Sequence, residues 1–203
     1  MGGKKIQRLT EVPRKLVGND SQPEGSRVSS PELEGGTSGH RALKNISSRP
    51  GQPHVSFNLQ GYHITAVKND IVLVLENEQS CNVGTGAELG RILKEIGSPG
   101  LRGNWDPGNA AMLDEVPYPD GYTAVKGLFS HMHVKDVRRN TATGKKEWAP
   151  VGGGYIDWKG QIQALRKDGY EGTMSLETHY LRPDRDKVES TRESLAGLMS
   201  LLS

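Results

Sequence analysis

The chain has 203 residues and a formal net charge of +2, which allows one domain or one domain with a tail. Only 33% of the residues are hydrophobic and no run of about 18 apolar residues occurs, so a membrane span is not expected. Cys81 is the only cysteine, which excludes an internal disulfide and is typical of a reducing compartment, so we expect a cytoplasmic protein.

The first 60 residues are polar and show neither a helical nor a strand period. Residues 1–50 carry nine Lys or Arg against five Asp or Glu. Such a segment cannot bury enough apolar surface to offset the entropy lost on ordering. Its basic residues are scattered and lack interleaved aromatic residues, which favours a solvated tail over a nucleic-acid contact. We therefore predict a disordered segment over residues 1–60 and one ordered domain over residues 61–203.

The ordered part opens with a strand, a loop and a helix. Residues 70–77, DIVLVLEN, form a short apolar run that is typical of a buried parallel strand. A helix is predicted over residues 85–97, because Thr85 and Glu88 have the spacing of a capping box and Gly97 is a suitable C-terminal stop. The apolar residues of this helix fall on one face: Leu89, Ile92, Leu93 and Ile96.

The same order then repeats along the chain. Further strands are predicted over residues 100–106, 130–136 and 172–179, and further helices near residues 121–129, 158–169 and 186–202. The apolar face of the last helix is predicted to hold Val188, Leu195, Leu198, Met199 and Leu202. Four successive βα units predict an α/β fold with a parallel sheet and right-handed crossovers.

Each predicted strand has a residue that can bind a metal at or near its C-terminal end. These residues are Glu76, Asp106, His133 and Glu177. Alone, each has an ordinary explanation as a loop residue, a turn former or a packed histidine. Their equivalent positions in four units favour a common site, because the C-terminal ends of parallel strands meet at one face. Oxygen ligands with one imidazole suit Mn²⁺, Mg²⁺ or Co²⁺ better than a structural zinc site.

Two histidines lie in the third predicted strand, SHMHVKD. Side chains alternate along a strand, so His131 and His133 point to the same face. We expect His133 to be a metal ligand. His131 lies deeper in the strand, and is expected to support the ligands, to face a substrate or simply to pack.

Five segments resemble one known family in order and spacing: VLENEQSCNVGTG, GNWDPGNA, HMHVKD, GGGYIDW and GYEGTMSLETH. They are similar to the second half of the sugar phosphate isomerase/epimerase family, whose members are xylose isomerase-like (β/α)8 TIM barrels. Ketose 3-epimerases and inosose dehydratases belong to it. The resemblance covers about residues 66–203, and implies the second half of such a barrel.

The resemblance also implies roles for single residues. One divalent metal would be bound by Glu76, Asp106, His133 and Glu177, and Glu76 and Glu177 would also be the acid/base pair. Arg139 matches an arginine that contacts the substrate in the epimerases. Asn109 and Asn82 stand where some members carry a histidine and a glutamate, and Lys135 and Asp136 match an HxKD variant. The implied substrate-side residues are Asn82, Asn109, His131, Lys135 and Arg139.

The implied chemistry starts from a small sugar or sugar phosphate. A metal that chelates its carbonyl and neighbouring hydroxyl stabilises an enediolate, while one carboxylate removes a proton and another returns it. Epimerisation, isomerisation and dehydration all remain open. The Gly152–Gly154 run could cradle a phosphate through its N–H groups. A flexible loop is favoured, because no helix opens on it with a Lys and a Ser or Thr.

A complete barrel of this type has eight strands and about 250 residues. Residues 54–60 could add one strand, and residues 62–70 resemble the end of the preceding helix. A truncated gene, a shifted reading frame at the front or a genuine half-barrel would each explain the shortage. An open half-barrel exposes two strand edges and an apolar inner face, so we expect a homo-oligomer that completes the barrel, a bound missing half or aggregation.

Three functions therefore remain. The first is a metal-dependent sugar isomerase or epimerase that is active when the barrel is completed. The second is an inactive barrel fragment that binds metal or serves as an interaction module. The third is a nuclease of the AP-endonuclease type, which needs a multi-zinc cluster with several more histidines. The chain has six histidines, of which His40, His54 and His63 lie outside the strand-end pattern.

Overall fold

The computed structural model describes residues 59–203, with side chains from residue 64 onward. The predicted disordered tail lies outside these residues, except that residues 59 and 60 begin a helix. The predicted strand over residues 54–60 also lies outside them, apart from these same two residues. Within the described part, no helix is long and apolar enough to cross a membrane.

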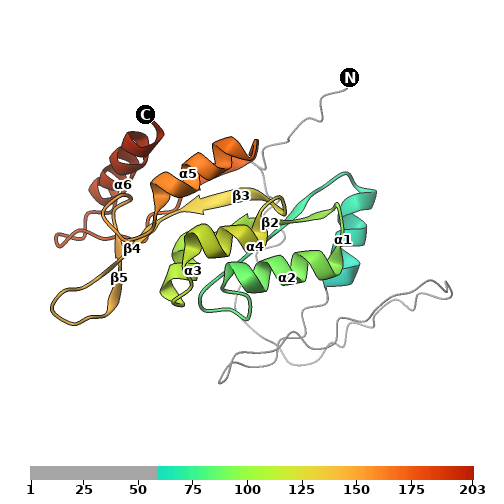
Figure 1. Ribbon diagram of the computed structural model, residues 1–203, viewed down its shortest axis with the longest axis horizontal. Coiled ribbons are helices and arrows are strands. Elements are labelled where there is room, and N and C mark those ends of the chain that lie inside the picture. Colours follow the sequence, from blue (N-terminus) through green and yellow to red (C-terminus); the bar gives the residue numbers. More distant parts are fainter. Residues whose placement is uncertain (1–58) are drawn as a thin grey trace, which may run out of the picture. The chain divides into compact units, whose positions relative to one another are not determined.

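The central feature is a four-stranded parallel sheet in the order β1-β2-β3-β6, flanked by helices (Figure 1). The strands are β1 (Leu73–Glu76), β2 (Leu101–Trp105), β3 (Phe129–Val134) and β6 (Thr173–Leu176). The helices are α1 (Leu59–Lys68), α2 (Gly86–Ile96), α3 (Pro107–Met112), α4 (Tyr122–Val125), α5 (Trp158–Lys167) and α6 (Lys187–Leu202). The predicted succession of four βα units is confirmed, and it gives about half of a barrel.

Helix α2 forms as its sequence predicts. Thr85 caps its N-terminus, Glu88 completes the capping box, and Gly97 ends it in the left-handed conformation with φ 59°. Gly90 faces the carbonyl of Ala124, so close that a Cβ would overlap it. The backbones of α2 and α4 can therefore touch, which a larger residue at position 90 would prevent.

Strand β1 is less buried than its sequence suggests. Leu73 and Leu75 pack on the helix side. Ile71 and Val72 before the strand and Val74 within it are about half exposed, at 51%, 52% and 49%. The prediction of a strand buried on both faces is therefore wrong. β1 is an edge strand of the described sheet, and its other face is half open at Val74.

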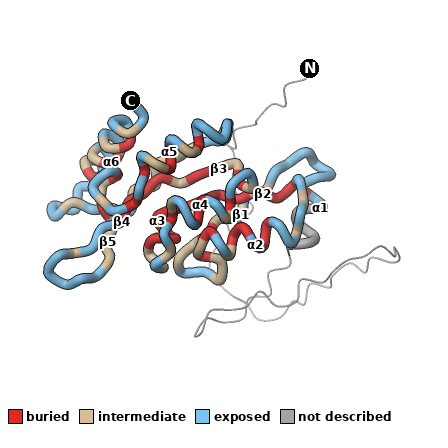
Figure 2. Tube along the Cα trace, in the orientation of Figure 1, coloured by how far each residue is buried: buried red, intermediate tan, exposed pale blue. Residues whose placement is uncertain are grey.

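The two faces of the sheet differ in polarity. Buried residues, red in Figure 2, run through β2, β3, α2 and α4. The helix-facing residues of β3 are apolar, including Met132 and Val134. A bulge at Ser130 shifts the pairing, because Gly103 is opposite Phe129 and Asn104 is opposite His131. Phe129 thereby joins the helix-side core, while both histidines of the strand turn to the opposite, polar face.

The helix predicted near residues 121–129 is much shorter. α4 has four residues and follows a π-helical turn, η2 (Pro117–Gly121). Lys126 has already left the helical conformation, with φ −48° and ψ 126°, and Gly127 has φ 74°. The chain then enters β3 at Phe129. The apolar residues read as a helix face are therefore shared between a short helix and a strand.

Helix α6 packs through a different face from the predicted one. Its buried residues are Ser190, Ser194 and Leu198. The other four residues of the predicted apolar face are exposed: Val188, Leu195, Met199 and Leu202. Small side chains let this helix approach the rest of the domain, since Gly197 lies against the carbonyl of Val151. Of the five residues predicted to share one apolar face, Leu198 alone is buried.

An antiparallel hairpin that the sequence did not reveal follows β3. It consists of β4 (Asp136–Arg139) and β5 (Lys146–Ala149). The glycine-rich loop after it closes on Asp136, which is 1% exposed. Asp136 accepts hydrogen bonds from the N–H groups of Gly152 at 2.9 Å and Gly154 at 3.1 Å. These amides are already bound to a carboxylate, which leaves no support for a phosphate cradle.

Asp136 also binds the N–H groups of Val137 at 2.8 Å and Ile156 at 3.4 Å. Burial raises the pKa of Asp136, although these hydrogen bonds oppose the rise. One charged side chain therefore joins the start of the hairpin to the loop that leads into α5.

We predict that Asp136→Asn destabilises the domain by about 1–3 kcal/mol, because the amide removes the charge and places an NH₂ group among N–H donors. Denaturant unfolding followed by circular dichroism measures the change. Asp120→Asn is the matched control, because Asp120 is exposed and its substitution should cost less than about 0.5 kcal/mol. Equal unfolding midpoints for Asp136→Asn and wild type would show that the loop is held by other contacts.

Candidate metal centre

Four segments bring one candidate ligand residue each to the C-terminal edge of the sheet. Glu76 is the last residue of β1, and His133 lies near the end of β3. Asp106 is the N-cap of α3 and accepts a hydrogen bond from the N–H of Asn109 at 2.8 Å. Glu177 follows β6 directly, and its N–H donates to the carbonyl of Val134 at 3.0 Å. Backbone pairing and a helix cap therefore place the ligands.

The structure brings the four predicted ligands together. One ligand atom from each residue lies within 4.8 Å of the others. His133 Nδ1 is central, at 3.1 Å from Glu76 Oε1, 3.3 Å from Glu177 Oε2 and 3.5 Å from Asp106 Oδ2. Three carboxylates and one imidazole around one point fit a divalent cation that prefers oxygen ligands.

Neighbouring cationic side chains balance the carboxylates. Hydrogen bonding to Asp106 and then to Glu76 raises the pKa of His133 to about 10, although burial opposes the rise. Burial alone would raise the pKa of Glu177, but Lys135 and His133 bring it below its usual value. Both shifts reflect the attraction between the carboxylates and the cationic side chains beside them.

Lys135, predicted on the substrate side, is buried beside two of the ligands. Its Nζ lies 2.9 Å from Asp106 Oδ2 and 2.5 Å from Glu177 Oε2, and 5.2 Å from the ring centre of Trp148. Burial would lower its pKa, but attraction to Asp106 and hydrogen bonding to Glu177 raise it overall. Lys135 therefore fixes one oxygen of each carboxylate.

His131 and Asn109 also adjoin the cluster. The rings of His131 and His133 meet edge to face with centroids 5.4 Å apart, and His131 Nε2 lies 2.8 Å from Ser175 Oγ. Burial and then the charge of His133 lower the pKa of His131. Asn109 is fully buried, and its Nδ2 donates to Glu76 Oε1 at 3.3 Å.

Arg139 and Asn82 are placed differently. Arg139 Nη2 lies 3.3 Å from Asp114 Oδ1, and Arg139 lines a pocket of about 600 Å³ with Tyr118 and Tyr155. Asn82 Oδ1 is buried without a hydrogen-bond partner among the described residues. Neither side chain makes a hydrogen bond to the four ligands within residues 64–203, so their contact with a substrate remains a prediction.

Three further residues support the site, and sequence reasoning missed them. Asn77 is fully buried and exchanges two 2.8 Å hydrogen bonds with the backbone of Asp106. The clue in the sequence that could have identified Asn77 was its position directly after Glu76. Asn104 Nδ2 lies 3.2 Å from His133 Nε2, and its signal was strand alternation, two residues before Asp106.

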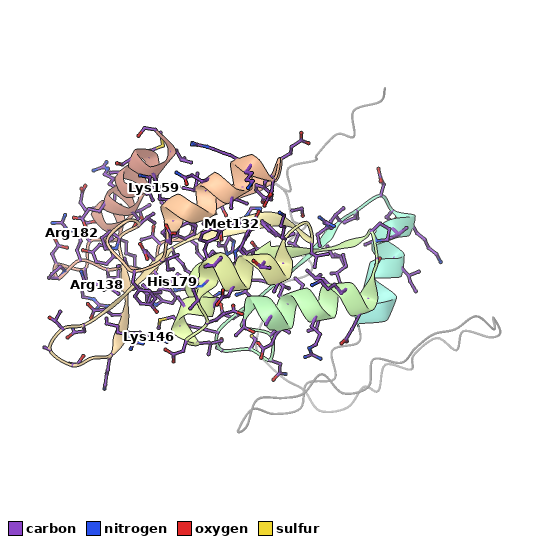
Figure 3. The ribbon with its side chains drawn as sticks, in the orientation of Figure 1. Met132, Arg138, Lys146, Lys159, His179 and Arg182 are labelled. Atoms are coloured by element: carbon purple, nitrogen blue, oxygen red, sulfur yellow. The ribbon has the colours of Figure 1, made fainter. Side chains whose placement is uncertain are left out.

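Trp148 gave no local signal, because it reaches the site from the unpredicted hairpin. Its ring contacts Lys135 and stacks edge to face with His179, labelled in Figure 3, at a centroid distance of 4.9 Å. His179 Nε2 in turn lies 3.7 Å from Glu177 Oε1. The hairpin and the end of β6 thus form one aromatic wall beside Glu177.

Solved structures share this fold. A xylose isomerase domain protein from Planctomyces limnophilus matches with TM-score 0.56 and 20% identity, over 70% of this chain and 49% of that one. A xylose isomerase-like TIM barrel protein from Mycobacterium smegmatis, in complex with magnesium, matches with TM-score 0.53 and 25% identity, over 70% and 49%. The 3-keto-D-glucoside 4-epimerase of E. coli matches with TM-score 0.54 and 20% identity, over 70% and 51%.

The chain therefore spans about half the length of the solved structures that it matches. No curated protein matches it. A family model described as xylose isomerase-like TIM barrel matches residues 58–201, which is most of the chain. The chain thus belongs to the xylose isomerase-like TIM barrel family.

Proposed function

We propose that this protein is a divalent-metal-dependent isomerase or epimerase of a sugar or sugar phosphate that acts through an enediolate. The carrying observation is the convergence of Glu76, Asp106, His133 and Glu177 within 4.8 Å. Structural neighbours named as sugar epimerases support the substrate class, including the E. coli enzyme and a D-allulose 3-epimerase from Methylomonas. Mn²⁺, Mg²⁺ and Co²⁺ all suit the ligand set.

A bound metal would supply Lewis-acid stabilisation of the negative charge that develops on the substrate oxygens. The chain's own residues would do the rest. Glu76 and Glu177 approach the centre from the two edge strands of the sheet, so they can transfer protons on different sides of a sugar. Lys135 holds Glu177 Oε2, which leaves Glu177 Oε1 free of that contact.

Substrate contacts would come from side chains around this centre. We assign this role to Asn109, His131 and Lys135, which adjoin the ligands, and to Asn82 and Arg139 through a change of side-chain position. A homo-oligomer would supply the walls that one chain lacks. Cys81, exposed and without a disulfide partner, is consistent with the cytoplasmic location that we propose.

The second candidate is a metal-binding fragment without catalytic activity. The observation that favours it is length, because the chain spans about half of the barrels that it resembles. Nuclease chemistry of the multi-zinc type has no such support. The candidate metal cluster found within the described residues includes a single histidine, His133.

We predict that the full chain binds one Mn²⁺ per copy in calorimetry. Glu177→Gln should weaken binding tenfold or more, by about 1.4 kcal/mol, because it replaces a charged ligand with a neutral one. Glu171→Gln is the control, since Glu171 carries the same charge, lies six residues earlier and is exposed. Unchanged affinity in Glu177→Gln would remove Glu177 from the ligand set.

We also predict that a verified monomer turns over ketoses or their phosphates poorly. Enediolate chemistry needs the sugar held between Glu76 and Glu177 with water excluded, and one chain leaves this site open. An epimerisation assay on size-fractionated protein with Mn²⁺ tests this. Turnover of about 1–1000 per second by the monomer would show that half a barrel suffices.

A further inference from the structure

We infer that two copies of this chain close one barrel through two identical head-to-tail contacts, in which the β6 end of each copy meets the β1 end of the other. The inference rests on surfaces that the structure leaves open at the two ends of the sheet. Its importance for catalysis rests on the proposed function, because the second copy would supply the missing walls of the site.

Both ends of the sheet are unpaired within the described residues. β1 pairs only with β2, and β6 pairs only with β3. All four strands run parallel, so the free edge of β6 in one copy can continue the hydrogen-bond ladder onto the free edge of β1 in another. An antiparallel β1–β1 or β6–β6 contact would also extend the sheet, but it would leave one free edge on each copy, whereas the head-to-tail contact leaves none.

Exposed apolar side chains accompany each free edge. The β6 end carries a stripe along α6, formed by Val188, Leu195, Met199 and Leu202, which are 37–61% exposed. The β1 end carries Ile64 and Val67 on α1 and Ile71 and Val72 before β1, which are 39–52% exposed. Figure 1 shows α1 and α6 at opposite ends of the row of helices.

Neither patch belongs to the hydrophobic core of the described residues. α6 is anchored by Ser190, Ser194 and Leu198, and its apolar stripe points elsewhere. Contiguous exposed apolar surface at an open strand edge marks an interaction site. α1 precedes β1 and α6 follows β6, so each contact between copies would bring α6 of one copy and α1 of the other to the same junction, where their apolar patches can cover each other.

A second copy is the occupant that the observations favour. The chain supplies four parallel strands and matches 49–51% of complete barrels, so two copies provide eight strands and remove both open edges. Each copy has a free β1 edge and a free β6 edge, so a dimer with a two-fold axis pairs all four edges at once. The inner face presents Asn104, His131 and Ser175, which can hydrogen-bond or bind water in the lumen.

The closed assembly has a chemical consequence. All four candidate ligands come from one copy, so a barrel made of two copies would carry two metal centres at its C-terminal rim. The proposed dimer would have the shape of a barrel built from one chain, but it would also have a two-fold axis. The expected stoichiometry is two Mn²⁺ per dimer.

Light scattering coupled to size exclusion measures the mass of the full chain and of single variants. We expect a dimer for wild type. Met199→Asp and Val67→Asp should each shift the protein to a monomer, with about half the mass, because each places a charge in both contacts of the dimer. Ser200→Asp is the matched control. Ser200 neighbours Met199 on α6, is exposed, and lies on another side of the helix.

Mixing the two variants tests the head-to-tail geometry. In a mixed dimer of Val67→Asp and Met199→Asp, both charges fall in one contact and the other contact is intact. An equimolar mixture should therefore recover dimer, whereas each variant alone should not. Recovery also demonstrates that both variants fold.

Three results would overturn the inference: a monomeric wild type, a Val67→Asp variant that remains fully dimeric, or a mixture that stays monomeric. Mn²⁺ calorimetry on the same samples separates this inference from the proposed function. A monomer that binds Mn²⁺ refutes the assembly alone. A dimer that binds none refutes the metal centre alone.

Discussion

Mutual repulsion among three carboxylates is the constraint around which this domain is organised. Glu76, Asp106 and Glu177 place oxygens within 4.8 Å of one ligand atom of His133. Like charges at this distance disfavour the folded chain unless cations oppose them. His133 and Lys135 provide positive charge beside these carboxylates, and a divalent ion would provide it at a single point. Backbone pairing thus holds three carboxylates close together, and this arrangement favours positive charge between them.

The sheet serves this site by separating two environments. On the helix side, Met132, Val134 and Trp105 join a continuous apolar core that supplies stability. On the other side, Asn104 and His131 form a polar layer under the ligands, with hydrogen bonds in place of apolar packing. Apolar burial therefore stabilises the helix side of the sheet, while the polar residues that support the candidate ligands lie on the other side.

Structural features that depend on a local sequence pattern could be predicted. The four βα units, the cap of α2 and the strand-end ligands follow from periodicity and spacing. The sequence could not predict features that depend on what covers a surface. Val74 and Met199 lie in apolar patterns but are exposed, because burial depends on what packs against a side chain and the other described residues do not cover them. Trp148 was missed because antiparallel pairing across a loop leaves little local signal, and Asn77 because its partner is 29 residues away.

The bulge at Ser130 determines which insertions and deletions this chain can tolerate. Gly103 and Asn104 are consecutive and lie opposite Phe129 and His131, so removing Ser130 would leave Phe129 directly before His131 in a regular ladder and keep both faces of β3. Side chains alternate along a strand, so adding or removing one residue between His131 and His133 would instead exchange the two faces on one side of the change. The tip of the β4–β5 hairpin has no such constraint, because residues 141–145 are exposed and lie outside the strand pairing. Length variation among relatives should therefore collect at the hairpin tip and at the bulge, while the number of residues between His131 and His133 stays fixed.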